Sequence, residues 1–138
     1  MQSFWPAQAK PVATGPVLKR AMPVVFVSNV QTSAVFFRDK LGFAIDFLHG
    51  HPPFYASVSR DAACLHLRFV HAPVITPQVR EREEGLLSAF LEVDNIQGLF
   101  AEYKAAGVEF AHPLRKEPWG ASAFIVLDPD GNGICFAG

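Results

Sequence analysis

The chain has few charged residues, few cysteines and no long apolar run, and each shortage excludes a class of protein. Charged side chains make up 18% of the 138 residues and hydrophobic ones 50%, which is the composition of one folded domain and not of a disordered chain. No apolar run approaches the roughly 20 residues of a membrane-spanning helix, so we expect no membrane partner. The two cysteines, Cys64 and Cys135, are too few for a disulfide framework and favour a cytoplasmic location.

The charge of the chain is unevenly distributed. Its net charge is −1, but residues 1–20 hold three basic residues and no acid, which leaves nine basic and 13 acidic side chains in the remainder. A slightly acidic domain lacks the basic face that a nucleic acid partner requires, so we expect no nucleic acid partner. Long-range attraction mildly favours a cationic or neutral small molecule.

Residues 1–20 differ in pattern from the rest of the chain. Prolines recur there at every fifth position, and no hydrophobic period is sustained. This pattern predicts an extended N-terminal arm, either disordered or lying on a neighbouring subunit, where Phe4 and Trp5 would supply contact area. Residues 21–138 are predicted to form a single domain.

Two segments of the domain share one order of elements. Each segment reads as strand, helix and three strands, with the helices at 29–40 and 96–106. The first helix can be capped by Asn29 or Thr32 and is followed by Gly42. The connection over 72–85 is predicted to be a solvated loop or a turn of helix. The predicted strands cover residues 22–27, 43–48, 54–59 and 64–70, then 86–93, 108–110, 122–127 and 133–137.

The two segments are an internal repeat. Val27-Ser-Asn-Val-Gln recurs 66 residues later as Val93-Asp-Asn-Ile-Gln, and Gly42-Phe43 recurs 65 residues later as Gly107-Val108. Cys64-Leu-His-Leu likewise corresponds to Gly133-Ile-Cys-Phe at an offset of 69. Three matches in the same order indicate two βαβββ repeats, about 21–70 and 86–137. We therefore predict an α+β fold with curved mixed sheets around a cleft.

Alternation along the strands assigns their side chains to faces. Leu65, Leu67 and Phe69 share one face, which the helix of the repeat must cover. The opposite face is a candidate binding surface, or a surface that a second copy of the chain covers. One sheet alone is too small to enclose a ligand, so the sheets must curve toward each other or toward a partner subunit. This face carries His66, Arg68, Ser88, Phe90, Glu92 and Cys135.

Several of these motifs together resemble a known superfamily. In the first repeat they are Val27-Ser-Asn with Ser33, Phe36-Phe37 and Leu41-Gly-Phe; in the second they are Leu91-Glu-Val-Asp-Asn, Ala106-Gly, Pro118-Trp-Gly, Leu127-Asp-Pro-Asp-Gly-Asn and Phe136. Over roughly residues 21–137 the chain resembles the vicinal oxygen chelate superfamily. That group includes glyoxalase I, extradiol dioxygenases, fosfomycin-resistance enzymes and bleomycin-resistance proteins. The chain is most similar to the bleomycin-resistance branch.

The resemblance implies four strand positions at which enzymes of the superfamily hold a divalent metal. They fall on Met22, His66, Ser88 and Cys135, of which only His66 is an ordinary ligand for such a metal. We therefore expect no metal cofactor and no catalytic residues. The alternative is a metal-dependent lyase, isomerase or dioxygenase with an altered metal site, in which Glu92 or a loop histidine substitutes. His66 and Cys135 are either a nucleophile–base pair or two inert wall residues, and we favour the second.

The resemblance also implies a homodimer that sequesters a planar, cationic drug in clefts between subunits, without a metal. It places an aromatic of the third strand at Tyr55 and a loop tryptophan at Trp119, which is either presented to a ligand or packed as a lid on its own subunit. His66 and Arg68 favour an anionic or neutral ligand over a polycation. A third alternative is an interaction module with a vestigial cleft. The expected ligand-binding residues are Phe54, Tyr55, His66, Arg68, Phe90, Trp119 and Cys135.

Overall fold

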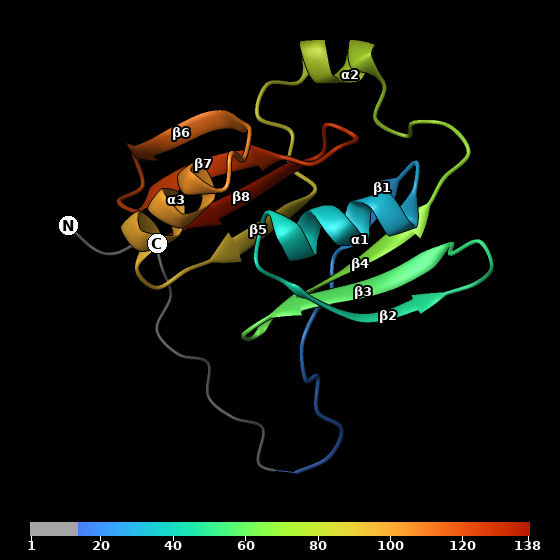
Figure 1. Ribbon diagram of the computed structural model, residues 1–138. Helices are drawn as coiled ribbons and strands as arrows, with labels where there is room; N and C mark the ends of the chain where they lie inside the picture. The colour runs from blue at the N-terminus through green and yellow to red at the C-terminus, as the bar shows by residue number, and fades with distance from the viewer. Residues whose placement is uncertain (1–13) are drawn as a thin grey trace.

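The computed structural model describes residues 14–138, so most of the predicted arm, residues 1–13, lies outside the described residues. The two predicted repeats are present and lie side by side, with a short helix on the connection between them (Figure 1). The first repeat consists of β1 (Val24–Val27), α1 (Val30–Asp39), β2 (Ala44–His49), β3 (Tyr55–Arg60) and β4 (Ala63–Phe69). After α2 (Pro77–Arg82), the second consists of β5 (Ala89–Glu92), α3 (Ile96–Ala105), β6 (Phe110–Lys116), β7 (Ser122–Leu127) and β8 (Gly133–Ala137).

Each repeat forms its own four-stranded mixed sheet, and the two sheets have the same topology. The strand orders are β1-β4-β3-β2 and β5-β8-β7-β6, and only the pairs β1–β4 and β5–β8 are parallel. Val24 pairs with His66 in the first sheet, as Phe90 pairs with Cys135 in the second. These pairs are related by the same offsets that the sequence matches showed, so the predicted duplication and the α+β fold class are confirmed.

The helix starts also repeat. Of the two predicted caps, Asn29 is the residue that caps α1, by accepting a hydrogen bond of 2.9 Å from the backbone N–H of Thr32. Asn95 caps α3 by accepting one of 3.1 Å from Gly98. Gly42 follows α1 with φ +74°, a left-handed conformation that glycine adopts without strain. The two helices therefore begin at equivalent residues.

The strand β6 differs most from its prediction. The sequence predicts a strand over 108–110, whereas β6 runs from Phe110 to Lys116 and contains Pro113. Proline is tolerated there because β6 is an edge strand of its sheet, so its missing N–H costs no ladder hydrogen bond. The predicted loop or turn of helix over 72–85 contains α2, which Thr76 caps.

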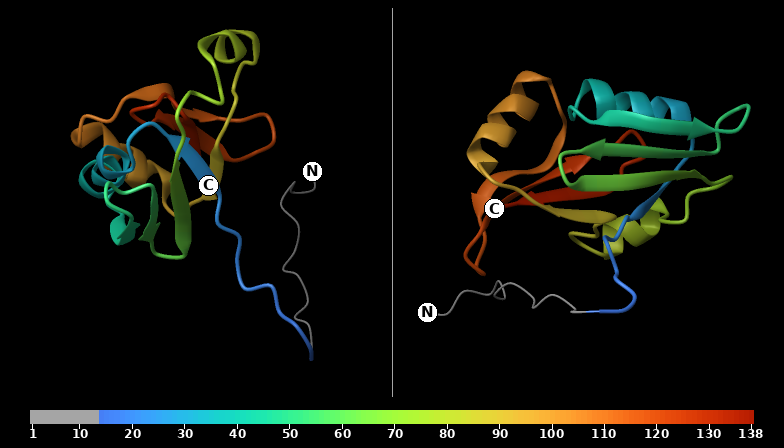
Figure 2. Two further views of the ribbon diagram at one scale, coloured as in Figure 1. Left: turned by 90° about the vertical axis from the view of Figure 1, so that its right-hand side faces the viewer. Right: turned by 90° about the horizontal axis from the view of Figure 1, so that it is seen from below.

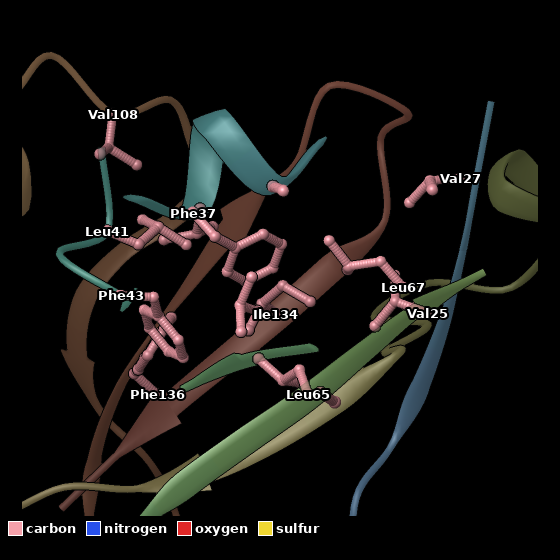
Figure 3. Packing of buried hydrophobic residues seen from close by; sticks show 14 of the residues in the cluster. Val25, Val27, Phe37, Leu41, Phe43, Leu65, Leu67, Val108, Ile134 and Phe136 are labelled. Atoms are coloured by element: carbon pink, nitrogen blue, oxygen red, sulfur yellow. The ribbon is translucent and has the colours of Figure 1, made fainter. Parts of the chain in front are cut away.

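The two repeats share one hydrophobic core. Phe37 of α1 packs among Leu65 and Leu67 of β4 and Ile134 and Phe136 of β8, and each of these five side chains is buried (Figure 3). Burying side chains of this size contributes about 1.5–3 kcal/mol each to folding, before conformational entropy is subtracted. Because the helix-covered faces of both sheets contribute to this core, the opposite faces lie on the outside of the chain.

Polar contacts join the repeats on both sides of the core. The Arg60 guanidinium donates two hydrogen bonds, of 2.7 and 3.0 Å, to the Glu102 carboxylate and a third, of 2.9 Å, to the carbonyl oxygen of Leu41. Arg60 thereby lowers the pKa of Glu102. Asn132 donates a hydrogen bond of 2.8 Å from its side chain to the carbonyl oxygen of Phe26. The Arg60–Glu102 and Asn132–Phe26 contacts connect the first repeat to the second.

Residues 128–132 form the turn between β7 and β8. Gly131 has φ +77°, and Asp128 accepts hydrogen bonds from the backbone N–H groups of Asp130 and Asn132, at 2.9 and 2.7 Å. Asp128 is 5% exposed, and burial raises the pKa of its carboxyl group. Asp130 also accepts a hydrogen bond of 3.0 Å from the backbone N–H of Ser28, so this turn connects β8 to the first repeat.

Candidate ligand-binding site

We name the side of the first sheet that α1 does not cover the first open face. A pair of polar rings lies at its centre. The Tyr55 hydroxyl lies 2.9 Å from Nδ1 of His66, and the two rings meet edge to face with their centroids 5.3 Å apart. The Phe47 ring lies on the other side of His66, with centroids 6.2 Å apart. Because Tyr55 engages Nδ1, Nε2 is the ring nitrogen of His66 that a ligand can reach.

Arg68 and Phe26 extend the first open face beside this pair. Arg68 pairs in register with Tyr55 of β3 on one side and Phe26 of β1 on the other, and side chains at paired positions point to the same face. Arg68 is exposed and Phe26 is 38% exposed. Phe54 lies at the edge of this face, where its ring packs against His49 with centroids 5.1 Å apart.

Asp46 also belongs to the first open face, and sequence reasoning missed it. The β2–β3 register shifts between Ile45 and Phe47, so the strand bulges at Asp46. The Asp46 carboxylate accepts hydrogen bonds of 2.8 Å from the Ser57 hydroxyl and 2.7 Å from the Ser59 hydroxyl. Ser57 is the register partner of His66, which places the carboxylate next to the ring pair.

The uncovered side of the second sheet, the second open face, has an aromatic cover. Trp119, from the β6–β7 connection, packs over Cys135 of β8 and Ala123 of β7, and its ring centroid lies 6.0 Å from that of Phe90. Cys135 is 5% exposed as a result. Burial raises the pKa of its thiol, and Glu117 adds to the effect. Trp119 therefore packs on its own chain.

The predicted ligand-binding residues fall into two groups, one on each open face. Tyr55, His66 and Arg68 come together on the first, with Phe54 at its edge, whereas Phe90, Trp119 and Cys135 come together on the second. His66 bonds to Tyr55, and Cys135 packs under Trp119. A thiol with a raised pKa is a poor nucleophile, so this arrangement favours the inert interpretation of His66 and Cys135.

The four implied metal positions do not form a donor set that fits a divalent metal. Met22 and Ser88 carry weak donors, and the thiol of Cys135 is buried with a raised pKa. Within residues 14–138, no group of three or more histidine, cysteine, aspartate or glutamate side chains is placed to hold a metal ion. We therefore derive no chemical step through a metal.

A cavity of about 240 Å³ adjoins the first open face. It lies between β1 and the connection to β5, and Val24, Phe26 and Ser88 line it together with Arg80. Arg80 donates a hydrogen bond of 3.1 Å to the backbone oxygen of Asp130, which fixes α2 beside the turn at 128–132. The cavity gives the first open face a hollow margin along β1.

Comparison with known proteins identifies the family. Residues 18–136 match the sequence profile described as the Glyoxalase/Bleomycin resistance protein/Dioxygenase superfamily. The chain belongs to this superfamily. A bleomycin resistance protein of Geobacillus stearothermophilus is 29% identical over 130 residues, which are 85% of this chain and 94% of that protein. A bleomycin resistance protein of Staphylococcus aureus matches with the same identity and coverage.

Solved structures of the superfamily have the same fold. The bleomycin-binding protein of Streptomyces verticillus, crystallised with copper(II)-bleomycin, superposes with a TM-score of 0.70 at 24% identity, over 88% of this chain and 97% of that one. A glyoxalase-related enzyme from Clostridium phytofermentans superposes with a TM-score of 0.68 at 18% identity, over 89% and 96%. Both comparisons show that this chain shares their fold. Within residues 14–138, no helix has the length and hydropathy to cross a membrane.

Proposed function

We propose that the protein binds a flat, antibiotic-like aromatic compound and does so without a metal. The observation that carries this proposal is the first open face, where Tyr55, His66 and Phe47 present ring edges and faces next to charged groups on a rigid sheet. Aromatic contacts of this kind contribute roughly 0.5–1.5 kcal/mol each beyond the area that they bury. The names of the relatives, bleomycin resistance and bleomycin-binding proteins, support a ligand of this class.

The complete binding cleft is proposed to form between two copies of the chain. Each open face lies on the outside of the chain, so one sheet cannot enclose a ligand by itself. Both faces expose large apolar side chains, including Val24 at 41%, Phe26 at 38% and Phe90 at 46%. Apposing the first open face of one copy to the second open face of another would bury these side chains and produce two equivalent clefts in a homodimer.

The test is a calorimetric titration with bleomycin and with neutral flat compounds such as biphenyl and acridine derivatives. We expect binding that raises the melting temperature, because a ligand of the native state stabilises it. The substitution Tyr55→Ala removes a ring from the first open face and should weaken binding by roughly tenfold or more. The matched control is Tyr103→Phe, which changes the chain's other tyrosine inside the core and should leave affinity unchanged. Absence of binding by every compound would contradict the proposal.

A further inference from the structure

We propose that the first open face selects a zwitterion: an aromatic core with a basic group that pairs with Asp46 and an acidic group that pairs with Arg68. This inference rests on the proposed function and specifies its ligand. The overall charge of the domain favours a cationic ligand, whereas His66 and Arg68 favour an anionic one. These two indications agree if the ligand carries both charges, because Asp46 can pair with its basic group. The site has one charge of each sign at opposite ends of its aromatic centre.

The Asp46 carboxylate is oriented for a cationic partner. Each of its oxygens accepts one serine hydrogen bond, from Ser57 and from Ser59, which fixes the plane of the group and leaves lone pairs on both oxygens. Among residues 14–138, no basic side chain forms an ion pair with it. An ammonium or guanidinium group of a ligand would form a charge-assisted hydrogen bond with the carboxylate, stronger than a neutral one.

Arg68 is the opposite end of the site. Its guanidinium is exposed on the same face, between Phe26 and Tyr55, and no acidic side chain of the described part of the chain pairs with it. A guanidinium has a planar donor array that matches a carboxylate or a phosphate.

The register fixes how far apart the two charges are. Asp46 on β2 and Arg68 on β4 are two strand spacings apart, because β3 lies between these strands. Along the strand direction, Asp46 lies opposite the position between Ser57 and Val58 of β3, whereas Arg68 lies opposite Tyr55. With strands ~4.8 Å apart and ~3.3 Å per residue, their Cα atoms are roughly 13 Å apart. Phe47, Tyr55 and His66 lie between them. A rigid core of about two rings, charged at both ends, fits this span.

The second repeat provides an internal comparison. Its edge strand β6 shifts register between Phe110 and His112, so Ala111 occupies the bulge that Asp46 occupies in β2. By the offset that relates His66 to Cys135, the counterpart of Arg68 is Ala137. The second repeat thus has alanine at both corresponding positions. The backbone that the two repeats share therefore forms without a charged side chain at either position.

The experiment compares four probes on one core: 4′-aminomethylbiphenyl-4-carboxylic acid, 4-biphenylmethylamine, biphenyl-4-carboxylic acid and biphenyl-4-methanol. Affinities are measured by calorimetry with the full chain at low and high salt. We expect the zwitterion to bind at least tenfold more tightly than the alcohol, with the singly charged compounds between them. Asp46→Asn should weaken binding of the zwitterion and the amine by roughly tenfold and leave binding of the acid unchanged. Arg68→Gln should weaken binding of the zwitterion and the acid by roughly tenfold and leave binding of the amine unchanged.

The controls make the same charge changes away from the site. Arg38 and Asp39 pair with each other at 2.8 Å on the exposed side of α1, so Asp39→Asn and Arg38→Gln should leave all four affinities unchanged. Thermal melting shows that each variant is folded. If the four probes bind with equal affinity, or if Asp46→Asn and Arg68→Gln have no more effect than their controls, the zwitterion inference is wrong while the proposed function stands. Failure of all four probes to bind would overturn the zwitterion inference, and it would overturn the proposed function as well only if bleomycin and the acridine derivatives also fail to bind.

Discussion

Tyr103 of α3 donates a hydrogen bond of 2.8 Å to the carbonyl oxygen of Leu41, just beyond the end of α1, and so joins the two repeats inside the core. Arg60 donates to the same carbonyl oxygen at 2.9 Å, so this one acceptor holds two donors. Burial raises the pKa of Tyr103 to about 12. This junction between the repeats yields two predictions about stability.

The first concerns Tyr103→Phe. The variant loses one hydrogen bond, but Arg60 still satisfies the Leu41 carbonyl, so we expect the free energy of unfolding to fall by about 1 kcal/mol. In the wild type, the unfolded state releases the tyrosine proton above pH 10, whereas the folded state keeps it to about pH 12. The unfolding free energy should therefore fall with rising pH in this window, by at most about 1.4 kcal/mol per pH unit.

Denaturant unfolding between pH 8 and 12 measures this effect, and the part due to Tyr103 should vanish in Tyr103→Phe. Tyr55→Phe leaves Tyr103 as the chain's single tyrosine, so tyrosinate absorbance in that variant reports its ionisation directly. An ionisation near pH 10 would show that Tyr103 is not buried as described.

The second prediction concerns Glu102→Gln. The pKa of Glu102 is lowered by the hydrogen bonds from Arg60, so the pair stabilises the fold above the unfolded pKa of about 4.3 and this stabilisation is lost as pH falls through the folded pKa. Both side chains are partly exposed, so we expect a loss of about 0.2–1 kcal/mol at pH 7. Urea unfolding at pH 7 and at successively lower pH should show wild type and variant converging in acid. A difference that grows in acid would contradict the assignment.

A third prediction tests the cover over the second open face. Trp119→Ala should expose Cys135, which Trp119 covers, and accelerate its reaction with a thiol reagent by tenfold or more under native conditions. Measurement in a Cys64→Ser background leaves Cys135 as the single thiol, and the introduced hydroxyl can keep the contact that the Cys64 thiol makes with Ser57 at 3.3 Å. An unchanged labelling rate would mean that Trp119 does not protect the thiol.

A fourth prediction concerns metals. We expect zinc, iron(II) and manganese(II) to bind substoichiometrically and to leave the melting temperature unchanged, because the four implied positions offer one ordinary ligand, His66. Elemental analysis of the purified protein and melting with and without a chelator measure this. A stoichiometric metal that His66→Ala removes would favour the alternative, a metal-dependent enzyme.

The parts of the fold that depend on local residue patterns could be predicted from the sequence. The strands β7 and β8 have the predicted bounds, since each is an alternating or buried run between clear turns. The cap at Asn29 follows from a side chain that competes for a backbone N–H. The strand β6 could not be bounded, because Pro113 argues against a strand unless the strand is known to lie at a sheet edge.

The candidate site was harder to predict for the same physical reason. Alternation correctly grouped His66 with Arg68, because β4 pairs regularly on both sides. It could not place Asp46, since a bulge changes which face each later residue of the strand occupies, and nothing in the letters of β2 marks it. The one available signal was the spacing of Ser57 and Ser59, two hydroxyls on one face of the adjacent strand.

The strands β2 and β6 each contain a bulge, and each is an edge strand of its own sheet (Figure 2). The residue at each bulge therefore lies away from the core. A residue at a bulge projects from the ladder without a facing neighbour, so exchanging alanine for a charged side chain there leaves the shared core untouched. The side chain at either bulge can therefore be exchanged without repacking the core that the two repeats share.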